Sequence, residues 1–170
     1  MQAELIVLRI VHVVGAIVWA GTAFFVAFFL MPSLRAAGPA AGPVMGELLK
    51  RRLFTIVPTV AVFTMLAGLR LLWIVSTGFS RDFFLSRSGH AYALGALCAI
   101  SAFTVFILVS HPAIGRSMQL GAQMAQAPES ERAALMSQLN AVRARSGKAT
   151  LATAILLMIA AIAMSVGRYL

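Results

Sequence analysis

Histidine and arginine are the residues that could carry chemistry in this otherwise apolar sequence. Histidines occur at His12, His90 and His111, and Arg70 interrupts an apolar segment. Neutral imidazole is a common ligand for haem iron and for copper. A guanidinium matches a carboxylate with two parallel hydrogen bonds. In a segment that spans a bilayer, an ionisable side chain is by default a candidate functional residue.

Four apolar segments must position these residues. Apolar residues make up 61% of the 170 residues and charged residues 11%, whereas a soluble domain has about a quarter of its residues charged. Each segment is long enough for a helix to cross a hydrocarbon layer of about 30 Å. The sequence therefore predicts one all-α domain, an integral membrane four-helix bundle without an evident internal repeat. The expected helices span residues 5–31, 53–76, 90–110 and 150–166.

Breaks and polar stretches separate these segments. Pro32 and the glycine–proline stretch at 38–43 are expected to end the first helix. Pro128 and Glu129 are typical of a helix start. Leu135, Leu139 and Val142 then fall on one helical face, which predicts an additional cytoplasmic amphipathic helix between the third and fourth spans.

The distribution of basic residues predicts the orientation, because cytoplasmic loops of membrane proteins are enriched in lysine and arginine. Five basic residues fall on the side of the two termini and nine on the other. We therefore expect an inner-membrane protein with both termini on the periplasmic side. The nine are Arg35, Lys50, Arg51, Arg52, Arg116, Arg132, Arg143, Arg145 and Lys148.

The net charge of +9 does not indicate a nucleic-acid partner, because these basic residues lie in short loops between apolar segments. The single cysteine, Cys98, lies within an apolar segment. A disulfide is therefore excluded within the chain, and Cys98 is expected to be a buried apolar residue.

This topology places His12, His90 and Arg70 in the same membrane half, where two imidazoles from two helices could hold a haem. Gly15 lies on the face of His12, and Gly68 and Gly95 could open further space. Arg70 could bind a haem propionate, pair with Asp82 or reach the headgroups. His111 follows His90 by 21 residues, about 31 Å along a helix, and belongs to the other half.

Structural interpretations of the same residues stay open. His12 could hydrogen-bond to a neighbouring helix without binding a metal. His90 could be a solvated residue at the membrane surface, and His111 likewise. Trp19 and Tyr92 are typical packing or interface residues. Copper bound by His12 and His90 is the alternative to haem.

Several stretches resemble the HemJ-type protoporphyrinogen oxidases and their CopD-type copper-resistance relatives. HVVGAIVWAG at 12–21, with its glycine three and its tryptophan seven residues after the histidine, resembles their first helix. Residues 47–72 resemble the entry into their second helix, and HAYAL at 90–94 and HPAIGR at 111–116 resemble the two ends of their third. The resemblance implies a four-helix haem b protein with His12 and His90 as ligands and Gly15 and Trp19 beside the cofactor.

The chain departs from the HemJ-type pattern at two places. Tyr92 lies near the position of a family lysine, and SGKATLATA at 146–154 lies where the family has an asparagine–glutamate–proline run. The resemblance thus implies a divergent branch.

The sequence leads to one main hypothesis about function, which is a membrane-embedded b-type haem protein for electron transfer or redox chemistry. Three alternatives are porphyrinogen oxidation with Arg70 on the substrate carboxylates, CopD-like copper handling, and a cofactor-free subunit of a membrane complex. The partners expected are the lipid bilayer and either a membrane redox partner or a porphyrin substrate. Homo-oligomerisation stays open.

Overall fold

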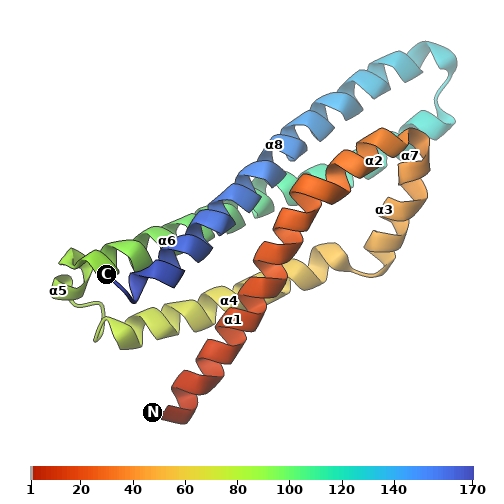
Figure 1. The fold of residues 1–170 in the computed structure, drawn as a ribbon. Coiled ribbons are helices and arrows are strands. Elements are labelled where there is room, and N and C mark those ends of the chain that lie inside the picture. The colour runs from red at the N-terminus through yellow and green to blue at the C-terminus, as the bar shows by residue number, and fades with distance from the viewer. Residues whose placement is uncertain (1) are drawn as a thin grey trace.

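The computed structural model describes residues 2–170, and within that range the chain is helical without a β-strand (Figure 1). This confirms the all-α class. Four helical segments are long and apolar enough to cross a membrane. They are Gln2–Ala37, Leu53–Val75, Arg87–Gln126 and Glu129–Gly167.

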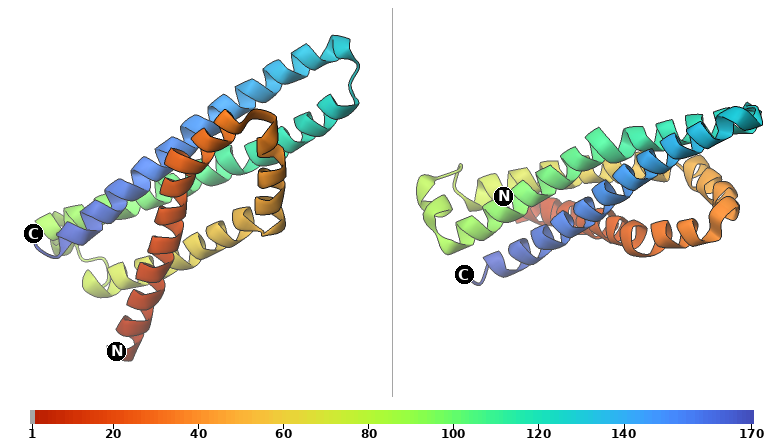
Figure 2. Two further views of the ribbon diagram at one scale, coloured as in Figure 1. Left: turned by 45° about the vertical axis from the view of Figure 1, so that its right-hand side comes forward. Right: turned by 90° about the horizontal axis from the view of Figure 1, so that it is seen from above.

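The long helices form two antiparallel pairs. α1 (Gln2–Phe25) packs against α4 (Leu53–Val75), and α6 (Arg87–Val105) packs against α8 (Glu129–Gly167). Both termini and the short α5 (Arg81–Leu85) lie towards one end of the molecule, which we call the terminal end (Figure 1). The N-terminal half of α1 diverges there from α6 and α8 (Figures 1 and 2). The two pairs are therefore joined mainly through the middle of the bundle.

The core contains one buried residue from each long helix: Trp19, Ala61, Ala102 and Leu157. The alanines allow the helices to approach closely around the indole ring. Large apolar side chains such as Ile17 and Leu108, both 68% exposed, point outwards instead. An apolar exterior around a small core of this kind suits a lipid environment rather than water.

Helix 1 does not end at Pro32 as expected. A π-helical turn, η1 (Val26–Leu30), connects α1 to α2 (Met31–Ala37), and Pro32 lies in the first turn of α2. The Met31 N–H donates to the Val26 carbonyl, five residues back, so the helix adjusts its hydrogen bonding just before the residue that has no N–H to donate. The break comes at Gly38, whose φ of +56° ends the helix.

A crosswise connection follows this break, at the end opposite the terminal end. It comprises the short η2 (Gly38–Ala40) and α3 (Ala41–Lys50), a helix that the sequence analysis did not predict. Arg52, with a φ of +56°, then turns the chain into α4. Proline at 43 does not prevent α3, because it falls in the first turn of that helix.

The third and fourth helices extend well beyond their apolar spans. A second π-turn, η3 (Phe106–Ser110), connects α6 to α7 (His111–Gln126). α8 begins at Glu129, where a helix start was predicted, and runs unbroken for 39 residues, about 58 Å. Residues 135–142, which were expected to form a separate amphipathic helix, therefore belong to the first part of α8. Leu120 and Leu139 are buried in this α7–α8 hairpin.

The two helix pairs are built alike, although no repeat is evident in the sequence. The π-turns begin at Val26 and Phe106, 80 residues apart, and each precedes a proline. Gly15 and Gly95 have the same separation, and both are buried where a helix contacts its antiparallel partner: Gly15 lies against Thr64 and Gly95 against Met164.

Candidate functional site

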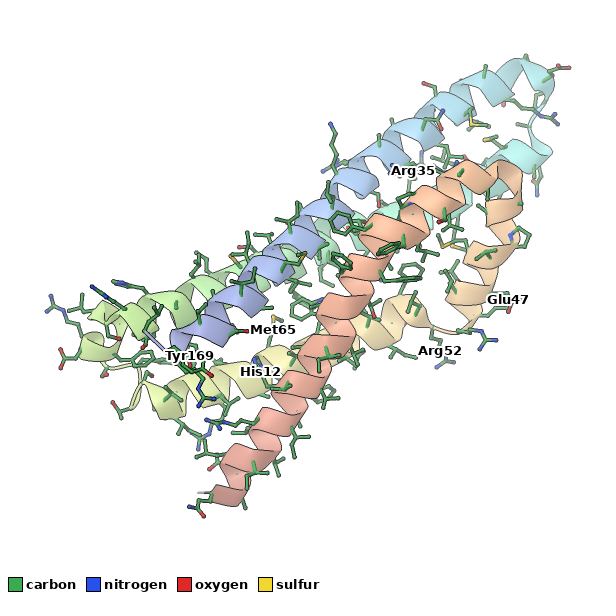
Figure 3. The ribbon with its side chains drawn as sticks, viewed as in Figure 1. His12, Arg35, Glu47, Arg52, Met65 and Tyr169 are labelled. Carbon is green, nitrogen blue, oxygen red and sulfur yellow. The ribbon has the colours of Figure 1, made fainter. Side chains whose placement is uncertain are left out.

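His12 lies on α1, half-buried against α4 (Figure 3). Its Nδ1 is 2.9 Å from the backbone carbonyl oxygen of Thr64. Because a carbonyl oxygen can only accept, Nδ1 carries the hydrogen and donates it. Nε2 is then the nitrogen with a free lone pair, and it is the atom available to a metal or to a proton.

The His12 ring rests directly on Gly68 of α4. A Cβ atom at position 68 would lie 2.6 Å from Cε1 of His12 and 2.8 Å from Nδ1, so only glycine leaves room for the ring. The space expected at Gly68 is therefore filled by the histidine itself. The space at Gly95 is filled in the same way by the side chain of Met164.

Gly15 and Trp19 continue the His12 face along α1. Gly15 is buried against Thr64, and a Cβ atom there would overlap the threonine hydroxyl, which donates to the Val60 carbonyl at 2.8 Å. Trp19 lies deeper, in the four-helix core, with its ring edge-to-face to Phe103 at 6.1 Å between centroids. The structure thus places both residues in helix packing next to His12.

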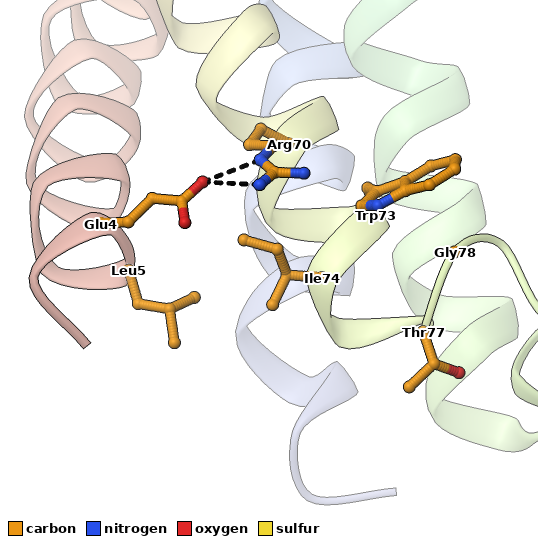
Figure 4. Close-up of a pocket in the computed structure, with 7 residues that line it drawn as sticks. All are labelled: Glu4, Leu5, Arg70, Trp73, Ile74, Thr77 and Gly78. Atoms are coloured by element: carbon orange, nitrogen blue, oxygen red, sulfur yellow. Dashed lines mark hydrogen bonds and ion pairs between the residues drawn. The ribbon is translucent and has the colours of Figure 1, made fainter. Parts of the chain in front are cut away.

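Arg70 pairs with Glu4 rather than with Asp82. The Glu4 Oε1 atom accepts from the arginine Nε at 2.9 Å and lies 2.7 Å from Nη2 (Figure 4). The two side chains are 49% and 41% exposed, with arginine first. Sequence reasoning missed Glu4. Its position in the sequence could have indicated this pair, because Glu4 lies in the first turn of α1, at the same end of the bundle as Arg70.

An open cavity of about 390 Å³ surrounds this ion pair (Figure 4). Its rim includes the end of α4, where Thr77 and Gly78 have φ values of +50° and +82°. A left-handed conformation is unusual for a β-branched residue such as threonine. The cavity is lined by Glu4, Leu5, Arg70, Trp73, Ile74, Thr77 and Gly78.

His90 lies apart from His12. It follows the first turn of α6, which begins where the Ser86 side chain accepts from the Gly89 N–H, and its side chain is exposed. No hydrogen bond links the two histidines within the described part of the chain, and α1 contacts α4 and α8 much more than α6. Residues 2–170 also contain no cluster of three or more histidine, cysteine, aspartate or glutamate side chains suited to a metal ion.

The rings of His111 and Tyr92 both pack against neighbouring residues. His111 begins α7, 21 residues after His90 in the continuous helical segment Arg87–Gln126, and its ring centroid is 6.2 Å from that of Phe106. Tyr92 follows His12 by 80 residues and occupies the matching position in the second helix pair: its ring faces Gly167, as His12 faces Gly68. This correspondence could not be recognised from the sequence, because the two rings and their partner helices differ.

Comparison with known proteins gives no assignment. No protein-family model, no curated protein and no solved structure matches the chain.

Proposed function

We propose that the protein is a membrane-embedded b-type haem protein that transfers electrons, with Nε2 of His12 as an iron ligand. The observation that carries the proposal is the hydrogen bond from Nδ1 of His12 to the Thr64 carbonyl. Histidines that bind metals commonly donate their other ring N–H to a backbone carbonyl or carboxylate, which fixes the tautomer and the ring orientation. A bound haem would supply the redox chemistry, and the protein would set its ligation and burial.

The neighbouring residues fit a haem held by one imidazole. Gly68 fixes the position of the ring. Arg70 follows Gly68 by two residues on α4, so its backbone lies on another side of the helix and only its long side chain could reach a haem bound at His12. Its guanidinium suits a haem propionate. Gly15 and Trp19, as packing residues beside His12, would hold the ligand helix in place.

His90 is the proposed second ligand. Its side chain is exposed and makes no hydrogen bond within residues 2–170, and α1 and α6 diverge at the terminal end (Figure 2). Coordination by His90 therefore requires the two helix pairs to close on each other around the haem. Iron with two histidine ligands has no open position, which favours electron transfer over oxygen activation.

The absorption spectrum of the purified protein tests the proposal. We expect a Soret band, with sharp α and β bands after reduction by dithionite. Colourless protein with bound copper would favour copper handling instead. Colourless protein without metal, even after incubation with haem, would leave only a cofactor-free membrane subunit.

The proposed location is the bacterial inner membrane, with both termini on the periplasmic side. It is supported by the four apolar helices and by the nine basic residues opposite the terminal end. Alkaline phosphatase fused after Leu170 should be active, since it folds only outside the cytoplasm. A green fluorescent protein fused at the same position should be dark, because it does not fold after Sec-dependent export. The reverse pattern would place His12 and Arg70 in the cytoplasmic half.

A further inference from the structure

Two arginines share one surface in the half of the bundle away from the termini, where α2 meets α8. The guanidinium of Arg35 on α2 lies directly over Gly147 of α8, where a Cβ atom would overlap it (Figure 3). Arg143 precedes Gly147 by four residues, which is one turn along the same face of α8. The two positive charges therefore lie next to each other on the outside of the bundle.

A third arginine, Arg116 of α7, belongs to the same surface. Leu120 and Leu139 are buried in the hairpin of α7 and α8 and mark the faces by which these helices contact each other. Arg116 lies one turn before Leu120 and Arg143 one turn after Leu139, so in the antiparallel hairpin both lie one turn nearer the apolar spans. All three arginines are exposed. We call Arg35, Arg116 and Arg143 the arginine cluster.

No carboxylate within residues 2–170 neutralises this cluster. The chain has five acidic residues. Glu4 and Glu47 form ion pairs with other residues, and Asp82 lies on α5 at the terminal end. Glu131 is the nearest acid along α8, and it precedes Arg143 by 12 residues, about 18 Å of helix. Like charges that share a surface repel each other, so the cluster suits an anion from outside the chain.

The cluster lies at the depth expected for lipid headgroups. Residues 10–34 before Arg35 and residues 88–115 before Arg116 contain no aspartate, glutamate, lysine or arginine. Each of these arginines is thus the first charged residue after an apolar span. Arg143 lies about 9 Å before the corresponding span of α8, which begins at residue 149. Charged residues that end an apolar span reach the interfacial layer, where the anions at hand are lipid phosphates.

We propose that the arginine cluster binds the phosphate of an anionic phospholipid. Guanidinium groups bind phosphate with two parallel hydrogen bonds, and basic pockets between membrane helices bind anionic headgroups. Leu151 and Met158 continue the Gly147 face along α8 with exposed apolar side chains, and the acyl chains would lie along this face. The proposal does not depend on haem binding, because it requires only that the four apolar helices lie in a membrane.

Native mass spectrometry of the protein in a non-ionic detergent tests the proposal, because it counts the lipids that remain bound. The protein is titrated with phosphatidylglycerol and, separately, with phosphatidylcholine of the same acyl chains, whose headgroup has no net charge. We expect the wild type to prefer phosphatidylglycerol, and Arg35→Gln and Arg143→Gln each to weaken its binding about fivefold. Gly147→Ala removes no charge but displaces the Arg35 guanidinium, so it should weaken binding to a smaller extent.

Arg145→Gln is the matched control. Arg145 lies at nearly the depth of Arg143 but about 200° around the helix, outside the cluster, so its replacement should leave the affinity unchanged. Equal weakening by Arg143→Gln and Arg145→Gln would mean that the lipid responds to overall surface charge, and would overturn the proposal. Equal affinity of the wild type for the two lipids would overturn it as well. Displacement of phosphatidylglycerol by soluble glycerol 3-phosphate would identify a free phosphate compound as the ligand and overturn the lipid assignment.

Discussion

Replacing His12 with alanine is expected to abolish haem binding. The change removes the Nε2 ligand and the ring that the Thr64 carbonyl orients, and within residues 2–170 no other histidine contacts α4 through a hydrogen bond. His90→Ala should either abolish binding or convert the iron from low to high spin, because one ligand would remain. The measurement is a reduced-minus-oxidised spectrum of each variant at equal protein concentration.

His111→Ala is the control for both variants. His111 lies 21 residues after His90, about 31 Å along the helix, so its replacement should leave the spectrum unchanged. Wild-type spectra from both His12→Ala and His90→Ala would exclude the ligand assignment. Loss of haem in His111→Ala alone would move the site to the half of the bundle away from the termini.

Gly68→Ala should have the second largest effect, although it adds only one methyl group. That methyl would lie 2.6 Å from Cε1 of His12, so the ring must move and lose its hydrogen bond to Thr64. Overpacking of this kind typically costs about 1–3 kcal/mol. We expect a loss of the low-spin haem signal and a lower midpoint in SDS unfolding.

Gly21→Ala is the matched control, because Gly21 is also helical and a Cβ atom there would meet no atom within 4 Å. Alanine is favoured over glycine in a helix by about 0.5–1 kcal/mol, so this variant should be as stable as the wild type or slightly more so. Equal behaviour of the two variants would show that the His12 ring does not depend on Gly68.

Hydropathy was sufficient to locate the four long helices, because each contains a continuous apolar segment long enough to span a bilayer. It could not predict that helix 1 continues through Pro32, since that depends on a π-turn of the backbone. Nor could it predict α3, whose ten residues include two glycines and a proline. Pro32 and the proline at 43 were expected to break helices, but both lie in the first turns of helices, and the break comes at Gly38, whose φ is positive.

The candidate site was predictable only in part. His12 and Arg70 stand out as polar residues in apolar segments, and the structure gives each a partner on another helix. The identities of those partners, the Thr64 carbonyl and Glu4, depend on how α1 crosses α4. A sequence pattern within one helix contains no information about that crossing. For the same reason, the sequence could not show that His12 and His90 lie on different helix pairs.

The π-turn η1 determines which neighbouring helices the first long helix can contact. A π-turn holds one residue more than the α-helix needs, and an extra residue shifts the phase of the helix by about 100°. Before it, His12 and Gly15 face α4; after it, the Arg35 guanidinium of α2 lies over Gly147 of α8 (Figure 3). Deleting one residue from Val26–Leu30 would restore a uniform α-helix in which these two faces could no longer meet both partners. The extra residue in the π-turn therefore lets one continuous helix contact both α4 and α8.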